Sequence, residues 1–365
     1  MEKERKRKSD SLYSFGKYFV LEERLPSLFK TNQRVVVITD TNVEKLYGSK
    51  LPPFEVFSFP AGEHSKTRET KERLEDELLS RGFGRETLFI GLGGGVVTDL
   101  TGFLASTFCR GAPHILIPTT LLGMVDAAIG GKSGVNTPYG KNLIGTFYPP
   151  QEVLIDGAFL SSLPPKEMNN GIVEMIKVGL VRSEEFLAKM ASSFDQWKEG
   201  DLSFLMDIIF EAASIKIGIV EEDPFEKKGL RRILNFGHTF AHAIEVANEY
   251  KVAHGEAVAI GILIACLISK RVGLLSNEHC VEIREIFDRY QIPLKLPHPL
   301  SPEEILPLLA RDKKNQSNTP RLVLLEGIGT AASFNSVYCT EVRGHLLEEA
   351  IQFANEHFVE KTYVH

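Results

Sequence analysis

Short apolar runs alternate with helical patterns through the first 155 residues of the chain. The runs are rich in Val, Ile and Phe, and they predict strands at residues 34–39, 54–59, 87–92, 114–118 and 153–156. Between them, residues 66–80 and 99–106 have helical spacing. Because strands that alternate with helices form βαβ units, we expect a Rossmann-like α/β domain with a mostly parallel sheet over residues 1–155.

The pattern changes after Leu163, which two prolines follow. From residue 166 to about residue 289, nearly every segment has a period of about 3.6 residues, with short breaks such as residues 222–229. We therefore expect a mainly α-helical second domain over residues 156–365. A strand-like run at residues 321–325 lies outside this pattern, and its place in the fold is left open.

Composition limits the class of protein. A length of 365 residues favours two domains, and 43% hydrophobic with 25% charged residues is typical of globular proteins. The net charge of −6 provides no basic face for a nucleic acid. The longest apolar stretch of the C-terminal half, residues 257–268, is shorter than the roughly 20 residues that a membrane span needs. We expect neither a nucleic-acid nor a membrane partner.

The chain start and the cysteines point to the cytoplasm. A basic run at residues 3–8 has no hydrophobic stretch after it, so we expect a solvated end and no secretory signal. The four cysteines are scattered and form no CxxC pair, which indicates neither a disulfide framework nor a cysteine zinc site: Cys109, Cys266, Cys280 and Cys339.

A glycine-rich segment, residues 91–95, follows a predicted strand and opens a predicted helix. Glycines let the backbone approach a phosphate, and the N–H groups of a helix start attract its charge. The spacing is not GxGxxG, so a tight turn without a ligand fits equally well. Asp40 ends another predicted strand, where its carboxylate could accept from ribose hydroxyls or simply cap the next helix.

Histidines with metal-ligand spacing occur in the helical part. His238 and His242 are four residues apart and share a helical face, and His254 begins the next apolar helix. Glu174 lies on a largely apolar helix with Lys177 one turn on. Three protein ligands with one open position suit a catalytic zinc, although ordinary buried polar residues are the alternative. The pattern is not HExxH, so a peptidase would lack its general base.

Residues 118–149 combine glycines, threonines, lysines and apolar residues. The apolar residues, among them Leu121, Val125, Leu143 and Ile144, predict that the segment packs against the protein instead of forming a flexible surface loop. Packed segments with fixed lysines commonly bind anions. The candidate anchors are Thr119, Thr120, Asp126, Lys132, Lys141 and Asn142.

Together these segments resemble the 3-dehydroquinate synthase family of sugar-phosphate cyclases, over about residues 40–315. The matching stretches are GLGGGVVTDLTGF, CRG, PTTLLGMVDAAIGGKSGVN, GKNLIGTFYPP, VEMIK, LNFGHTFAHAIE, HGEAVAIG and DKKN. The resemblance implies NAD+ between an α/β and a helical domain, with zinc, or alternatively cobalt, held by Glu174, His238 and His254. It implies conversion of 3-deoxy-D-arabino-heptulosonate 7-phosphate to 3-dehydroquinate and phosphate by transient oxidation, phosphate elimination, reduction and aldol closure.

The resemblance also implies roles for further residues. The cofactor or its surroundings would contact Asp40, Asn42, Glu63, Lys66, Gly94, Gly95, Val96, Asp99, Thr119, Thr120, Lys132 and Lys141. The substrate would face Asp126, Lys132, Asn142, Lys177, Lys216, Arg231, Asn235, His242 and one of Lys313 and Lys314, with Lys216 and Arg231 on its carboxylate. Arg110 would reach the phosphate in a neighbouring subunit's site, which implies a homodimer.

The chain departs from the family pattern in one segment. Residues 223–231 carry Pro224 where the family usually has an acidic residue and contain one residue more, so Glu226 aligns with a family acid. Three alternatives compete with the synthase. They are a cyclase whose substrate lacks a carboxylate, an NAD- and metal-dependent alcohol dehydrogenase of related fold, and a nucleotide-binding regulatory protein without chemistry.

Overall fold

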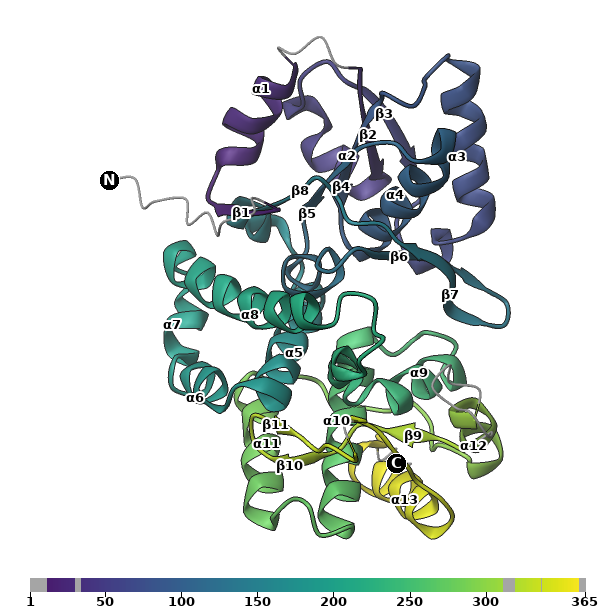
Figure 1. The fold of residues 1–365 in the computed structure, drawn as a ribbon. Helices are drawn as coiled ribbons and strands as arrows, with labels where there is room; N and C mark the ends of the chain where they lie inside the picture. Colours follow the sequence, from purple (N-terminus) through teal and green to yellow (C-terminus); the bar gives the residue numbers. More distant parts are fainter. Residues whose placement is uncertain (1–11, 30–33, 311–318, 336, 361–365) are drawn as a thin grey trace, which may run out of the picture. The chain divides into compact units, whose positions relative to one another are not determined.

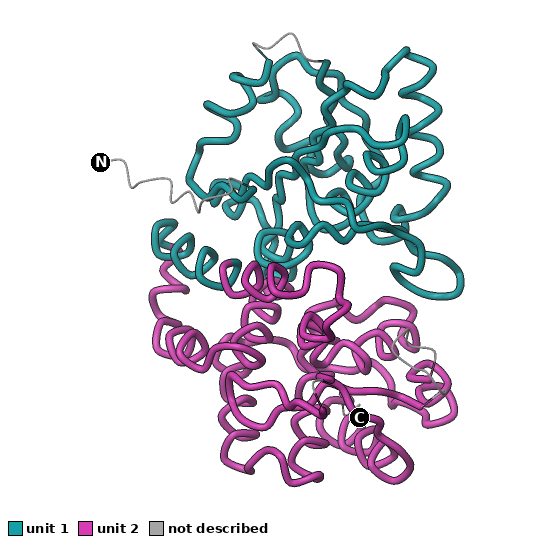
Figure 2. The backbone as a smooth tube through the Cα atoms, in the orientation of Figure 1, with its two compact units in different colours: residues 1–168, 201–213 teal, residues 169–200, 214–365 magenta. Residues whose placement is uncertain are grey.

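The structure is a computed structural model that describes residues 12–29, 34–310, 319–335 and 337–360. The chain divides into two compact units (Figure 2). Unit 1 comprises residues 1–168 and 201–213, and unit 2 comprises residues 169–200 and 214–365. The basic run near the N-terminus and the pair Lys313 and Lys314 lie outside the described residues.

The first half of the chain alternates strands with helices (Figure 1). Its elements are β1 (Tyr13–Gly16), η1 (Val20–Arg24), α1 (Leu25–Phe29), β2 (Val35–Asp40), α2 (Thr41–Tyr47), η2 (Gly48–Lys50), β3 (Glu55–Phe59), η3 (Glu63–Ser65), α3 (Arg68–Ser80), β4 (Leu88–Gly93), α4 (Gly95–Thr107), η4 (Phe108–Arg110), β5 (His114–Pro118), η5 (Gly123–Ala127), β6 (Lys132–Thr137), β7 (Gly140–Phe147), β8 (Glu152–Asp156) and η6 (Gly157–Ser162).

The second half is mainly helical. Its elements are α5 (Pro165–Arg182), α6 (Glu184–Ser192), α7 (Phe194–Glu199), α8 (Leu202–Glu222), η7 (Leu230–Asn235), α9 (His238–Ala247), α10 (His254–Arg271), α11 (Asn277–Arg289), α12 (Pro302–Ala310), β9 (Arg321–Leu322), β10 (Leu325–Gly327), β11 (Thr330–Ala331), β12 (Thr340–Glu341) and α13 (His345–Phe358).

A six-stranded parallel sheet forms the centre of unit 1, with the strand order β1-β8-β5-β4-β2-β3. The largely apolar strands β4 and β5 are buried along their whole length, as expected for strands that are covered on both faces. On one face, Leu74 of α3 and Leu100 of α4 pack into the same core as Phe89 of β4. On the other, Tyr47 of α2 packs edge-on against Phe159 of η6. The expected Rossmann-like sheet is confirmed.

Helix α10 forms the centre of unit 2. Nearly all of its residues from Ala257 to Ser269 are buried, and it contacts α9, α11 and α13. A helix that is apolar on all sides must be surrounded by other elements. The expected helical character of this half is therefore confirmed. Within the described residues, no helix has the length and apolar character that crossing a membrane requires.

Two predicted elements begin or end differently. Helix α4 starts at Gly95, four residues before the predicted start, directly after Gly94, whose backbone is extended. A Cβ on Gly95 would lie 3.3 Å from Ala127 Cβ, so packing explains why a poor helix former stands in the first turn. The predicted strand at residues 321–325 is two short strands. β9 pairs with β12, and β10 pairs with β11.

Residues 118–149 form the turn η5 and the antiparallel hairpin β6–β7, neither of which the sequence pattern predicted. Leu121 and Val125 are buried, as expected. The expectation was wrong for Leu143 and Ile144 of β7, which remain 40% and 38% exposed. These two residues lie in a two-stranded hairpin, so the packing of β7 depends on what lies beside the hairpin and not on the local apolar pattern.

His114 is a buried titratable group at the start of β5. Its ring stacks on Tyr148 with centroids 5.3 Å apart, and its Nε2 has no hydrogen-bond partner among the described residues. Because burial disfavours the charged ring, the pKa of His114 falls from 6.5 to about 4.

We expect acid to destabilise unit 1 through His114. The unfolded chain takes up a proton near pH 6.5 and the folded chain only near pH 4, so stability is lost as pH falls between these values. The loss reaches about 3 kcal/mol at pH 4. In urea titrations from pH 7.5 to 4, His114→Gln should lose correspondingly less stability than the wild type. A difference between the two proteins that stays constant with pH would contradict this role.

Candidate functional site

The carboxyl ends of β2, β4 and β5 carry many of the predicted cofactor residues. The chain runs from β2 to β3 on one side of β2 and returns to β4 on its other side, so the ends of β2 and β4 flank a switch point of the topology. Ligands of open parallel sheets bind at such points. Asp40 lies at the end of β2, Gly94 after β4 and Thr119 after β5.

Asp40 and the glycine segment have clear local roles. Asp40 Oδ1 accepts from the N–H groups of Asn42 and Val43 at 2.9 and 3.0 Å, so it caps α2. A Cβ on Gly93 would lie 2.4 Å from Val97 Cγ2, so only glycine fits between β4 and α4. Gly94 has no side chain to cap α4, which leaves the first N–H groups of this helix available to an anion.

Lys66 is the centre of a polar network in unit 1. This lysine is buried, pairs with Asp99 of α4, and donates to Asn142 Oδ1 at 2.6 Å. Burial alone would lower the pKa of Lys66, but the carboxylates of Asp99 and Glu63 raise it above its ordinary value. Lys141 Nζ lies 4.0 Å from Glu63 Oε1. The structure thus brings together five of the predicted residues.

Asn136 joins this network, and the sequence reasoning missed it. Its Nδ2 donates to Glu63 Oε1 at 2.7 Å, and its Oδ1 accepts from the N–H of Asn142 at 3.1 Å. Its own N–H donates to the Lys66 carbonyl at 2.8 Å. Asn142 adopts a left-handed backbone with φ of 53°, so Asn136 holds it in a conformation that few residues adopt. The position of Asn136 between Lys132 and Lys141 was the available signal.

The other predicted residues of unit 1 are spread over several elements. Thr120 packs its methyl group 3.0 Å from the Cβ position of Gly94, and Asn42 and Val96 lie in the first turns of α2 and α4. Asp126 lies in η5. Arg110 follows the opposite end of α4, a 13-residue helix about 19 Å long, and so lies far from its own glycine segment.

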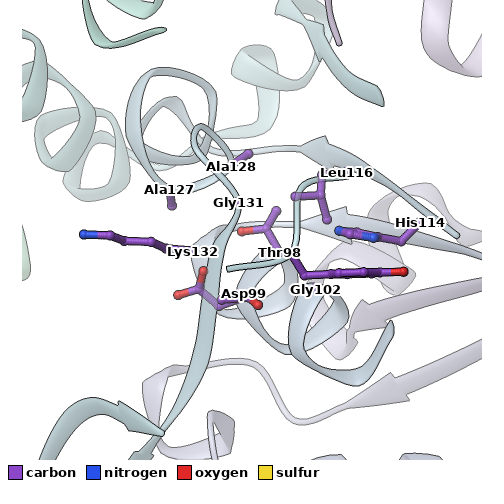
Figure 3. Close-up of a pocket in the computed structure, with 11 residues that line it drawn as sticks. Thr98, Asp99, Gly102, His114, Leu116, Ala127, Ala128, Gly131 and Lys132 are labelled. Atoms are coloured by element: carbon purple, nitrogen blue, oxygen red, sulfur yellow. The ribbon is translucent and has the colours of Figure 1, made fainter. Parts of the chain in front are cut away.

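Lys132 and Asp99 line a small cavity of unit 1 together with His114 (Figure 3). The cavity has room for about one water molecule. Ser133 also lines it, and the Oγ of Ser133, like His114 Nε2, has no hydrogen-bond partner among the described residues. The base of the hairpin therefore adjoins α4 through a polar and narrow space.

A buried cluster in unit 2 contains the three predicted metal ligands. Glu174 Oε1 lies 3.5 Å from His238 Nε2 and 3.8 Å from His254 Nε2. One ligand atom from each residue lies within 4.8 Å of the others, and Glu174 is 2% exposed. Lys177 pairs with Glu174 and is also buried. Two imidazoles and a carboxylate are a donor set that zinc accepts.

The protonation state of His238 suits metal binding. Burial first, and then the positive charge of Lys177, hold the pKa of His238 well below its usual range, so its ring is neutral. The His238 Nδ1 lies 3.2 Å from the Phe236 carbonyl, which can accept its proton. A neutral ring with Nδ1–H has its lone pair on Nε2, the atom that faces Glu174. The residues therefore fit a divalent metal.

The other predicted substrate residues within the described part of unit 2 lie on α8, η7 and α9. Arg231 is buried, and its Nη1 donates to the Pro224 carbonyl at 2.7 Å. Residues 223–231, which differ from the family pattern, therefore anchor the guanidinium. Asp223 holds that segment by accepting from the N–H groups of Lys228 and Arg231 at 3.0 and 3.2 Å. Glu226, aligned with a family acid, has a left-handed backbone.

The remaining predicted side chains lie on neighbouring elements of the same unit. Lys216 is buried on α8, and Asn235 ends η7 with its Nδ2 donating to the Arg232 carbonyl at 3.3 Å. The ring of His242 lies 5.6 Å from that of His238.

Comparison with known families agrees with both halves of the chain. Residues 56–170 match the 3-dehydroquinate synthase N-terminal domain, and residues 171–315 match the C-terminal domain. A 3-dehydroquinate synthase of Nitrosospira multiformis is 43% identical over 308 residues, which cover 82% of this chain and 84% of the relative. One from Chlamydia pneumoniae is 38% identical over 352 residues, covering 90% and 92%.

Solved structures of related cyclases share the whole fold. A 2-epi-5-epi-valiolone synthase from Streptomyces hygroscopicus with NAD+ and Zn2+ bound matches with a TM-score of 0.80 at 28% identity, covering 96% of this chain and 98% of that one. A 2-deoxy-scyllo-inosose synthase complexed with carbaglucose-6-phosphate, NAD+ and Co2+ matches with 0.79 at 28% identity, covering 93% and 96%. A probable glycerol dehydrogenase from Sinorhizobium meliloti, 14% identical, shares the fold alone. With both domains matched in order and close relatives over most of its length, the chain belongs to the 3-dehydroquinate synthase family.

Proposed function

We propose that this protein is an enzyme that converts 3-deoxy-D-arabino-heptulosonate 7-phosphate to 3-dehydroquinate and phosphate, a carbon–oxygen lyase reaction of the shikimate pathway. The observation that carries the proposal is the buried cluster of Glu174, His238 and His254 beside Lys177, in a chain of the 3-dehydroquinate synthase family. A purely structural cluster would not need two imidazoles facing one buried carboxylate.

NAD+ would bind at the carboxyl ends of β2, β4 and β5. The uncapped start of α4 would hold its pyrophosphate through backbone N–H groups. When bound there, NAD+ would take up and return a hydride in each cycle. The network around Lys66 supports this site because it fixes Asn142 and Lys141 on the hairpin. A positive charge held at that position would attract the phosphate-bearing ligands.

Zinc, or cobalt, would be held by Glu174, His238 and His254 and would act as a Lewis acid towards a substrate hydroxyl. Lys177 offsets the charge of Glu174 in the buried cluster, and it would also be a proton donor within reach of the substrate. His242 and Asn235 would orient the substrate by hydrogen bonds.

Two buried cations would select a substrate that carries a carboxylate. Arg231 has one end of its guanidinium fixed by the Pro224 carbonyl, so its orientation is set before the substrate arrives. Lys216 would provide a second charge. The cyclases of known structure suggest a second candidate, a cyclase whose phosphorylated substrate carries no carboxylate. Two buried cations suit a substrate carboxylate better than a neutral group, which favours the acid substrate.

Arg110 would serve a neighbouring subunit, and the enzyme would be a cytoplasmic homodimer. The distance along α4 supports this part of the proposal, since Arg110 follows the end of the helix opposite to the glycine segment. Asp126 and Lys132 would then complete the cradle for the phosphate together with the neighbour's arginine.

Phosphate release without accumulation of NADH would test the proposed function. Since the hydride leaves and returns, turnover should require NAD+, release phosphate from the heptulosonate phosphate, and produce no net absorbance from NADH. A coupled phosphate assay and an absorbance trace on the same sample measure both quantities. If NADH accumulates in proportion to product, the protein is a dehydrogenase. If no phosphate is released with metal and NAD+ present, the synthase function is wrong.

A further inference from the structure

Glu245 is a buried carboxylate of α9 to which the sequence motifs gave no role. It is 2% exposed, and its Oε1 lies 3.2 Å from His254 Nδ1. His238, His242 and Glu245 are four and then three residues apart, so they share one face of α9. Glu245 therefore lies on the face of the helix that carries the metal-ligand cluster.

The two nitrogens of His254 face different partners. Nδ1 lies against Glu245, while Nε2 lies 3.8 Å from Glu174 Oε1. A neutral imidazole carries one proton, so a ring that donates from Nδ1 presents a lone pair at Nε2. The carboxylate of Glu245 thereby selects the tautomer in which the ligating atom faces the other two ligands.

The backbone beside His254 is fixed independently of Glu245. Asn170 Oδ1 of α5 accepts from the N–H of Gly255 at 2.7 Å, and a Cβ on Gly255 would lie 2.7 Å from Asn170 Cα. This contact places the start of α10 and does not involve the ring of His254. Glu245 supplies the contact that fixes the ring itself.

The charge of Glu245 also favours a cation in the cluster. Glu174 and Glu245 carry two negative charges, and Lys177 as an ammonium carries one positive charge. The carboxylate of Glu245 adds to the electrostatic attraction that Glu174 exerts on a divalent cation.

We propose that Glu245 is a positioning residue that orients His254 and strengthens divalent metal binding by the cluster. The inference deepens the proposed function and rests on its metal site. The carboxylate accepts the Nδ1 proton, holds the ring plane towards Glu174, and raises the basicity of Nε2.

The affinity for Zn2+ alone tests the proposal without any catalytic assay. Glu245→Gln is nearly isosteric but removes the charge, and it should weaken Zn2+ binding by about 10- to 100-fold in competition with a chromophoric chelator. The matched control is Glu256→Gln, because the Glu256 carboxylate accepts from the Ala253 N–H at 3.4 Å at the same helix start. It should leave the affinity within about 2-fold. Circular dichroism of each metal-free protein accompanies the titrations.

Nitrogen NMR of the wild type adds a readout that needs no variant at position 245. His254 should carry its proton on Nδ1, and Zn2+ should shift its Nε2 resonance. A proton on Nε2 in the metal-free protein, or metal on Nδ1, would overturn the role of Glu245. So would a folded Glu245→Gln protein with wild-type affinity. If the wild type itself fails to bind Zn2+ or Co2+, the metal site of the proposed function falls, which is a distinguishable result.

Discussion

Replacing His254 by alanine should abolish stable zinc binding and lower kcat/KM for the heptulosonate phosphate by roughly 1,000-fold or more. A Lewis acid stabilises developing charge by several kcal/mol, and about 4 kcal/mol corresponds to that factor. His254 occupies the first position of α10 and its side chain is 28% exposed, so the fold should persist. Elemental analysis, phosphate release and the thermal unfolding temperature measure the three quantities.

The control for this experiment is His345→Ala, which removes an exposed histidine from the first position of α13. It should leave the metal content and the rate unchanged. Chelation of the wild type should reproduce the loss seen in His254→Ala, and added zinc or cobalt should restore activity only to the wild type. Full activity of a wild-type preparation shown to contain no metal would refute the proposed metal chemistry.

Arg231→Ala should lower kcat/KM for the heptulosonate phosphate by roughly 30- to 5,000-fold. A desolvated carboxylate–guanidinium contact contributes about 2–5 kcal/mol, much of it the penalty for leaving one partner unpaired. Substrates without the carboxylate, such as sedoheptulose 7-phosphate, should be poor for the wild type and nearly indifferent to the substitution. Steady-state phosphate release with each substrate measures the comparison.

Arg232→Ala is the matched control, because Arg232 is the next residue of η7 and its Nη1 makes a long contact of 4.0 Å to Cys339 Sγ. It should affect both substrates little. If Arg231→Ala harms both substrates equally, Arg231 does not anchor the carboxylate. If the wild type cyclises sedoheptulose 7-phosphate as well as the acid, the enzyme is a different sugar-phosphate cyclase.

The candidate metal ligands could be predicted because each lies on a helix with a strong local signal. Glu174 and Lys177 interrupt an apolar helix, and His238 begins a helix in which His242 follows one turn later. An ionisable residue on an otherwise apolar face must find a partner, so local pattern alone marks it as special. Helical periodicity could not show which of these residues lie together, and the family motifs indicated that Glu174, His238 and His254 form one site.

Glu245 and Asn136 were not predicted, for a different reason. Each acts on a residue of another element: Glu245 of α9 on His254 of α10, and Asn136 of β6 on Glu63 of η3. The local sequence around a single polar residue does not show whether its side chain contacts another element of the fold or is exposed to solvent. Only the packing of one element on another reveals these contacts.

The sequence by itself determined five of the six strands of the parallel sheet, the helical second half and the caps of α2 and α3, whereas β1 was not predicted. Buried parallel strands are continuous apolar runs, and Asp40 and Thr67 cap their helices with their own side chains, so these features depend on neighbours along the chain. The tertiary structure decided the hairpin β6–β7, the division of residues 321–325 between two sheets, and the attachment of residues 201–213 to unit 1. The attachment of residues 201–213 shows the physical reason. Helix α8 is one continuous helix, yet its residue Phe210 packs against Phe15 of β1 within unit 1. Helical periodicity shows which face of a helix is apolar, but the surface that buries this face is set by residues almost 200 positions away.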